Sequence, residues 1–108
     1  MCTYKTLKNN QHGYVMQCKG CRHIQVAFTS FILSLTIDQF HELIATVDRS
    51  YNKHKHLPFT EEKIVQIATV ARSVTLVFSV NEIREFLSLL IEGRTNIEYK
   101  QLFVFNEN

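Results

Sequence analysis

Glycine, proline and cysteine are all scarce in this sequence of 108 residues, which contains 3 Gly, 1 Pro, 3 Cys and no tryptophan. So few glycines and prolines leave little room for flexible linkers, and a glycine-rich phosphate-binding loop is difficult to build. No apolar run approaches the roughly 18 residues of a membrane span. The N-terminus also lacks the apolar stretch and cleavage site of a secretory signal, so we expect a cytoplasmic protein without a membrane partner.

Acidic residues are unevenly distributed, since none occurs before Asp38. The same stretch contains Lys5, Lys8, Lys19 and Arg22, whereas acidic residues outnumber basic ones in the rest of the chain. A basic half can mark a surface that contacts nucleic acid. Dispersed charges are equally consistent with the solvated faces of strands, so nucleic acid is one candidate partner among others.

No arrangement of residues typical of an enzyme occurs in the sequence. It contains no nucleophile elbow, and its carboxylates fall on predicted helix surfaces rather than in pairs suited to acid–base catalysis. We therefore expect a small non-catalytic binding or scaffold module, formed by one domain over residues 1–108. Its partner would be another protein or a second copy in a homodimer, contacted through a sheet edge or through the apolar segment Leu102–Phe105.

Two segments about 43 residues apart begin a helix in the same way. Thr36 stands three positions before Gln39, and Ser79 stands three positions before Glu82. Both pairs match the capping box, in which the hydroxyl accepts a hydrogen bond from the backbone N–H three residues on and the longer side chain reaches back. After the second helix, Gly93 predicts a left-handed C-terminal cap. The match between the two segments predicts an internal duplication.

The repeated unit is predicted to be two strands followed by a helix. Apolar residues recur with helical spacing after both capping boxes, and the wider stripe predicts that the second helix either is the more buried or contributes to a subunit interface. Short runs rich in β-branched and aromatic residues precede each helix. The predicted strands are 13–18, 21–28, 31–35, 64–70 and 75–78, in units of about 13–53 and 61–93 with a tail at 94–108. A helix opening at Thr60–Glu62 is the alternative for 64–70, where the Ile, Val and Thr content favours a strand. The tail stays unassigned, because Thr95 and Glu98 match a capping box whereas Leu102–Phe105 resembles a strand. Such units predict an α+β fold in which one antiparallel sheet carries both helices on one face.

A cysteine pair lies at the tip of a predicted hairpin. Lys19 and Gly20 separate two strand-like runs, and two residues with glycine second suit a tight turn. This register places Cys18 opposite Cys21, with both side chains on the less apolar face together with His23. Residues directly opposite one another have Cβ atoms about 4.5–5.5 Å apart, so both sulfurs could reach one metal ion.

Three interpretations of this pair remain open. In a zinc site the thiolates of Cys18 and Cys21 need two further ligands, and Cys2 and His23 are candidates. The other candidate ligands are His12, His54 and His56. A redox dithiol of the thioredoxin type lies at a helix start, whereas a strand is predicted to follow here. In the third interpretation both cysteines are ordinary reduced residues near a turn, in keeping with an odd number of cysteines in a cytosolic chain.

The sequence combines Cys2, the pair Cys18 and Cys21, the run Ile24–Phe28 and the helix start Leu35–Phe40. In this combination the chain resembles an uncharacterised family of short Bacteroidetes proteins that have an N-terminal cysteine and a CxxC hairpin. Members of that family often have glycine where this sequence has Thr29 or Ser30. The resemblance covers about the first half of the chain, and it implies no activity, ligand or catalytic residue.

Overall fold

The computed structural model describes residues 3–58 and 61–99. The elements in chain order are β1 (Tyr4–Asn10), β2 (Gly13–Cys18), β3 (Ile24–Phe28), β4 (Phe31–Leu35), α1 (Ile37–His54), β5 (Val65–Ala68), β6 (Thr75–Phe78) and α2 (Val80–Arg94). The predicted α+β class is confirmed. The predictions that involve Cys2 and Leu102–Phe105 lie outside the described residues.

The first four strands form an antiparallel sheet in the order β1-β2-β3-β4. Burial alternates residue by residue along β3, because successive side chains of a strand point to opposite faces. In β1 the register shifts at Leu7, an extra residue whose side chain is buried. The turn between β3 and β4 consists of Thr29 and Ser30, and Thr29 has a φ of 49°, in the region that favours glycine. The turn therefore forms without a glycine.

Both predicted helix starts are confirmed. The hydroxyl of Thr36 accepts a hydrogen bond from Gln39 N–H at 3.1 Å, and the Gln39 side chain accepts from Thr36 N–H at 2.9 Å. Ser79 and Glu82 form the same reciprocal pair at the start of α2. Neither of these helices is long and apolar enough to cross a bilayer within the part of the chain that the structure describes.

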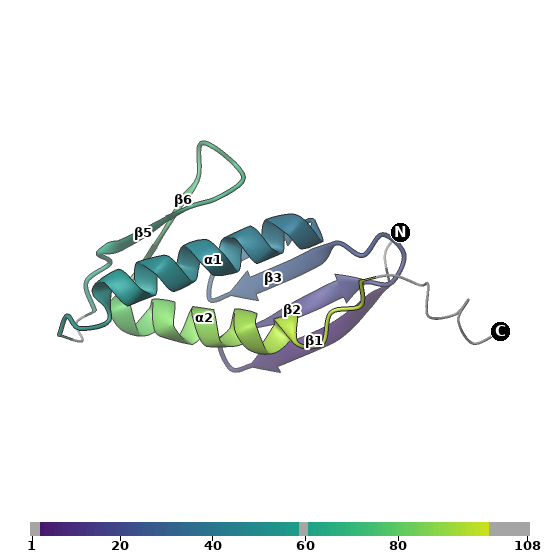
Figure 1. The fold of residues 1–108 in the computed structure, drawn as a ribbon, viewed down its shortest axis with the longest axis horizontal. Coiled ribbons are helices and arrows are strands. Elements are labelled where there is room, and N and C mark those ends of the chain that lie inside the picture. The colour runs from purple at the N-terminus through teal and green to yellow at the C-terminus, as the bar shows by residue number, and fades with distance from the viewer. Residues whose placement is uncertain (1–2, 59–60, 100–108) are drawn as a thin grey trace.

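One hydrophobic core lies between the helices and the sheet. Figure 1 shows α1 and α2 side by side on one face of the sheet formed by β1 to β4, as predicted. The core includes the fully buried rings of Phe40 and Phe86, with Phe28 of β3 against Phe86 at a centroid distance of 4.9 Å. α2 buries more side chains than α1, which confirms that it is the more buried helix.

Gly93 is a packing residue rather than a helix cap. It lies inside α2 and does not have a positive φ, so the prediction of a left-handed cap there is wrong. A Cβ atom at Gly93 would lie 2.9 Å from the side chain of Val15, a separation that real Cβ contacts do not show. The absence of a side chain at this position therefore allows α2 to approach β2 closely.

The prediction of one continuous sheet is wrong, because β5 and β6 form a separate two-stranded sheet. The predicted strand at 75–78 is confirmed, whereas the strand predicted at 64–70 is shorter and extends over Val65–Ala68. Four strands precede α1 but two precede α2 in the described residues, so the duplication is not confirmed beyond the helix starts. The ring of Phe78 lies 6.2 Å from that of Phe31 between centroids, which joins the sheets by packing rather than by a strand ladder.

Candidate metal centre at the cysteine loop

The cysteine loop, residues Lys19–His23, connects β2 to β3 and is longer than predicted. Cys18 N–H donates to His23 O at 2.9 Å, so Cys18 lies opposite His23, and the prediction that it lies opposite Cys21 is wrong. The register moves because four residues, 19–22, rather than two separate the opposed positions, with Arg22 in the left-handed region at a φ of 67°. A displacement of two residues preserves the face to which each strand side chain points.

Cys18 and Cys21 occupy different environments. Cys18 is buried at the end of β2, whereas Cys21 is exposed. Cys18 is therefore less accessible to solvent than its predicted position on the less apolar face implied. The N–H of Cys21 donates to the sulfur of Cys18 at a donor–acceptor distance of 3.4 Å. An N–H directed at a sulfur stabilises negative charge on it, and a metal-bound thiolate carries such charge. The turn thus brings the two cysteines together and provides one sulfur with a hydrogen-bond donor.

The other candidate ligands are distributed unevenly. His23 is exposed and belongs to the cysteine loop. Cys2 lies outside the described residues, but Thr3 follows it directly in the sequence, and Thr3 O accepts a hydrogen bond from Lys19 N–H at 2.8 Å. Among residues 3–58 and 61–99, no group of three or more His, Cys, Asp or Glu side chains is placed to hold a metal ion. Cys18 and Cys21 are therefore the described part of a candidate site.

The alternative histidines lie away from the cysteine loop. His12 is in the turn between β1 and β2, at the other end of β2 from Cys18, with its ring 5.9 Å from that of Phe28. His54 ends α1, where its Nδ1 lies 2.7 Å from Ser50 O. His56 follows α1 and is exposed. These positions do not complete a site with Cys18 and Cys21.

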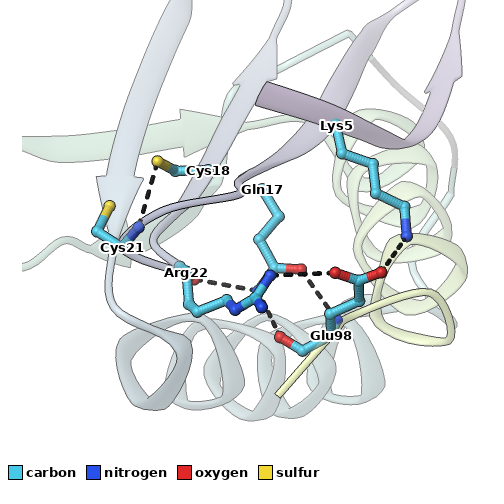
Figure 2. A network of polar contacts seen from close by, with 6 residues as sticks. All are labelled: Lys5, Gln17, Cys18, Cys21, Arg22 and Glu98. Carbon is cyan, nitrogen blue, oxygen red and sulfur yellow. Dashed lines mark hydrogen bonds and ion pairs between the residues drawn. The ribbon is translucent and has the colours of Figure 1, made fainter. Parts of the chain in front are cut away.

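Gln17 connects the cysteine loop to the segment after α2 (Figure 2). Its buried side chain donates from Nε2 to Arg22 O at 3.2 Å and to Glu98 O at 2.8 Å. Its Oε1 accepts from Glu98 N–H at 2.9 Å. Arg22 Nη1 contacts one oxygen of the Glu98 carboxylate at 3.0 Å, and Lys5 Nζ contacts the other at 2.9 Å. One set of polar contacts therefore holds together β1, the cysteine loop and the residues after α2.

The charge on Glu98 supports this arrangement. The hydrogen bond from Lys5, together with the positive charges of Lys5 and Arg22, lowers the pKa of Glu98 below its ordinary value of 4.5. Glu98 is consequently ionised at neutral pH, and both ion pairs persist there. Because Lys5 and Glu98 are partly exposed, water screens this contact, and the directional hydrogen bonds of Gln17 contribute more to the position of the segment.

Much of the positive charge in the N-terminal half is balanced within the chain. Lys5 and Arg22 contact Glu98, and Lys8 Nζ lies 3.5 Å from a carboxylate oxygen of Glu92. These acidic partners lie more than 50 residues after Asp38, so charge counting by segment does not reveal the pairing. The excess of basic residues before Asp38 is therefore not matched by an equal excess on the folded surface.

The sequence interpretation missed the contacts made by Gln17 and Glu98. A usable signal existed for Gln17, because it shares the inward face of β2 with Val15, and a polar residue among apolar ones requires a partner. For Glu98 the pattern was misleading, because Thr95 and Glu98 match a capping box and so predict the start of another helix. The structure instead ends α2 at Arg94, with the hydroxyl of Thr95 donating to a carbonyl of the last turn.

The fold and the loop together define a small α+β domain with a cysteine pair at one end of its main sheet. Residues 1–107 match the model of a family of unknown function (DUF6686), and the chain belongs to that family. No curated protein and no solved structure matches the chain. The comparisons thus indicate no activity, ligand or partner.

Proposed function

We propose that this protein is a small zinc-binding module in which Cys2, Cys18 and Cys21 supply thiolates and His23 supplies the fourth ligand. The observation that carries the proposal is the hydrogen bond from Cys21 N–H to the sulfur of Cys18 at 3.4 Å, which holds the pair in one tight loop. Three thiolates and an imidazole are a ligand set of the kind found in closed, four-coordinate zinc sites.

Chain connectivity supports the inclusion of Cys2. Thr3 is hydrogen-bonded to Lys19, the residue after Cys18. Cys2 directly precedes Thr3 in the sequence, which is why we include it among the proposed ligands. A closed site has no open coordination position for a substrate, so the role of the ion is to stabilise the loop and the sheet end rather than to catalyse a reaction.

Metal analysis of the purified protein tests the proposal directly. Chain produced with added zinc, and never exposed to a chelator, is expected to retain about one zinc ion per molecule. Removal of the ion should lower the melting temperature, because a ligand that binds only the folded state stabilises it. Cobalt in place of zinc should give the absorption bands of a tetrahedral thiolate complex.

Substitutions separate the ligands from other residues. Cys18→Ser and Cys21→Ser should each abolish stoichiometric binding, whereas Cys2→Ser and His23→Ala should weaken it. His56→Ala is the matched control, because this exposed histidine lies outside the cysteine loop. The proposal fails if the protein contains no zinc and its melting temperature is the same with zinc and with chelator. It also fails if the variant lacking both Cys18 and Cys21 retains the ion.

A second candidate function is self-association through the edge of β4. This strand pairs only with β3 in the described residues, and Ile32 on it is 58% exposed. The edge of an antiparallel strand is complementary to itself, so a second copy can pair with it about a twofold axis. Sedimentation equilibrium should then show a dimer that Ile32→Lys dissociates. A monomer at all accessible concentrations would exclude this candidate, and neither result depends on zinc.

A further inference from the structure

The segment after α2 is attached to the cysteine loop through main-chain groups. Gln17 binds both the N–H and the C=O of Glu98, at 2.9 and 2.8 Å, as a neighbouring strand would. On the same segment, Asn96 Nδ2 donates to Leu7 O at 2.8 Å, and Ile97 is buried in the core. Residues 95–99, which we call the docked segment, are therefore held against β1, β2 and the core.

The same Gln17 side chain is also hydrogen-bonded to the cysteine loop. Its Nε2 donates to Arg22 O at 3.2 Å, and this carbonyl belongs to a residue with a positive φ of 67°. Arg22 follows Cys21 directly, so the two residues share one peptide group. The guanidinium of Arg22 contacts Glu98 at 3.0 Å, which gives the loop a second connection to the docked segment.

Arginine at this φ has a conformational cost, because residues with a Cβ atom rarely adopt the left-handed region. Hydrogen bonds from Arg22 N–H to Cys18 O at 3.0 Å and from Cys21 N–H to the Cys18 sulfur oppose that cost. A metal ion bound to both cysteines would fix their separation, and it would thereby hold Arg22 in the conformation that Gln17 and Glu98 recognise.

We propose that zinc at the cysteine loop controls the docking of residues 95–99, so that loss of the ion releases this segment from the sheet. The inference rests on the proposed zinc site and adds its regulatory consequence. Zinc and the docked segment stabilise one loop conformation, so each raises the affinity of the protein for the other by the same factor. Release would uncover the apolar surface of Leu7 and Ile97, both of which are buried when the segment is docked.

Hydrogen exchange of the full chain, with zinc or with chelator and reductant, tests the coupling. Removal of zinc should accelerate exchange of the Glu98 N–H by about tenfold or more, because its hydrogen bond to Gln17 is lost. Amides in the buried part of α1, from Leu43 to Val47, should keep their rates and so report that the domain stays folded. Equal acceleration in both regions would mean global unfolding and would overturn the proposal.

Reciprocal coupling gives a second measurement on intact protein. Glu98→Ala removes the contact with Arg22 without touching any proposed ligand, and it should weaken zinc binding by about fivefold. The matched control is Glu92→Ala, because Glu92 forms a similar exposed ion pair with Lys8 that does not involve the loop. If zinc binds equally to both variants and Glu98 exchange is independent of zinc, the coupling is wrong while the zinc site stands. If no zinc binds to the wild-type protein, both proposals fail.

Discussion

Replacement of Gln17 by leucine should destabilise the protein far more than a surface substitution of the same type. The change keeps a side chain of similar size on the inward face of β2 but removes hydrogen bonds to Arg22 O, Glu98 O and Glu98 N–H, all within 3.2 Å. At about 0.5–1.5 kcal/mol for each bond, and with water replacing some of them at the exposed Glu98, we expect a loss of about 2–3 kcal/mol. For a domain of this size that corresponds to a fall in melting temperature of roughly 10–20 °C.

Urea denaturation of the wild type and the variants, all in the same buffer with excess zinc and reductant, measures this loss with residues 95–99 docked. Gln25→Leu is the matched control, because Gln25 is half-buried on the opposite face, where it accepts a hydrogen bond from Tyr14 at 3.1 Å. Its free energy of unfolding should change by about 0.5 kcal/mol or less, as for most surface substitutions. If Gln17→Leu is as stable as the wild type, or if both variants lose the same amount, Gln17 does not organise this end of the sheet.

Three further predictions concern helix packing, helix starts and acid sensitivity. Gly93→Ala should lower the free energy of unfolding by about 1 kcal/mol. Crowding against Val15 costs about 1–3 kcal/mol, and the higher helix propensity of alanine offsets about 1 kcal/mol of that cost. Adding Val15→Ala should remove the crowding, so that Gly93→Ala no longer destabilises that background, and urea titration of the three variants checks this. Thr36→Ala and Ser79→Ala should each cost about 1 kcal/mol in urea unfolding, and no loss in either would argue against the capping boxes. Because the pKa of Glu98 is lowered in the folded state, its ionised form stabilises the protein above pH 4.5 and this contribution disappears as the pH falls further. The stability difference between wild type and Glu98→Gln should therefore shrink on acidification, and a difference that grows would contradict the ion pairs.

Local signals in the sequence predicted the helix starts correctly. Thr36 with Gln39 and Ser79 with Glu82 satisfy each other's backbone groups within four residues, so no distant partner is needed to determine them. The inward faces of β3 and β5 were predictable for the same reason, since burial alternates along these two strands. The division into two sheets was not predictable, because β4 and β6 meet through packing of Phe31 against Phe78 rather than through a strand ladder, and such contacts leave no pattern in a single sequence.

Gly93 shows that a glycine near the end of a helix can be either a left-handed cap or a close-packing residue. A glycine after an apolar helical stripe is typical of a left-handed cap, and propensity alone predicts that structure. The same residue is required when a helix lies close to a strand, as here against Val15. The distinction depends on the distance between α2 and β2, which is fixed only when all strands of the sheet are in place.

The conformation of the cysteine loop also depends on contacts that are distant in the sequence. Lys19 and Gly20 satisfy the rules for a two-residue turn, yet the chain forms a longer loop that ends with Arg22 in a left-handed conformation. Gln17 supplies a reason, because its side chain binds the carbonyl of Arg22 while also binding Glu98, which is 81 residues away. The spacing of Cys18 and Cys21 alone therefore specifies that two thiols are near each other, but not how they are oriented. Their orientation depends on Gln17, a polar residue on the inward face of β2, and on residues 95–99 after α2. A metal at this loop would consequently depend on the integrity of the whole sheet end, and not only on its ligands.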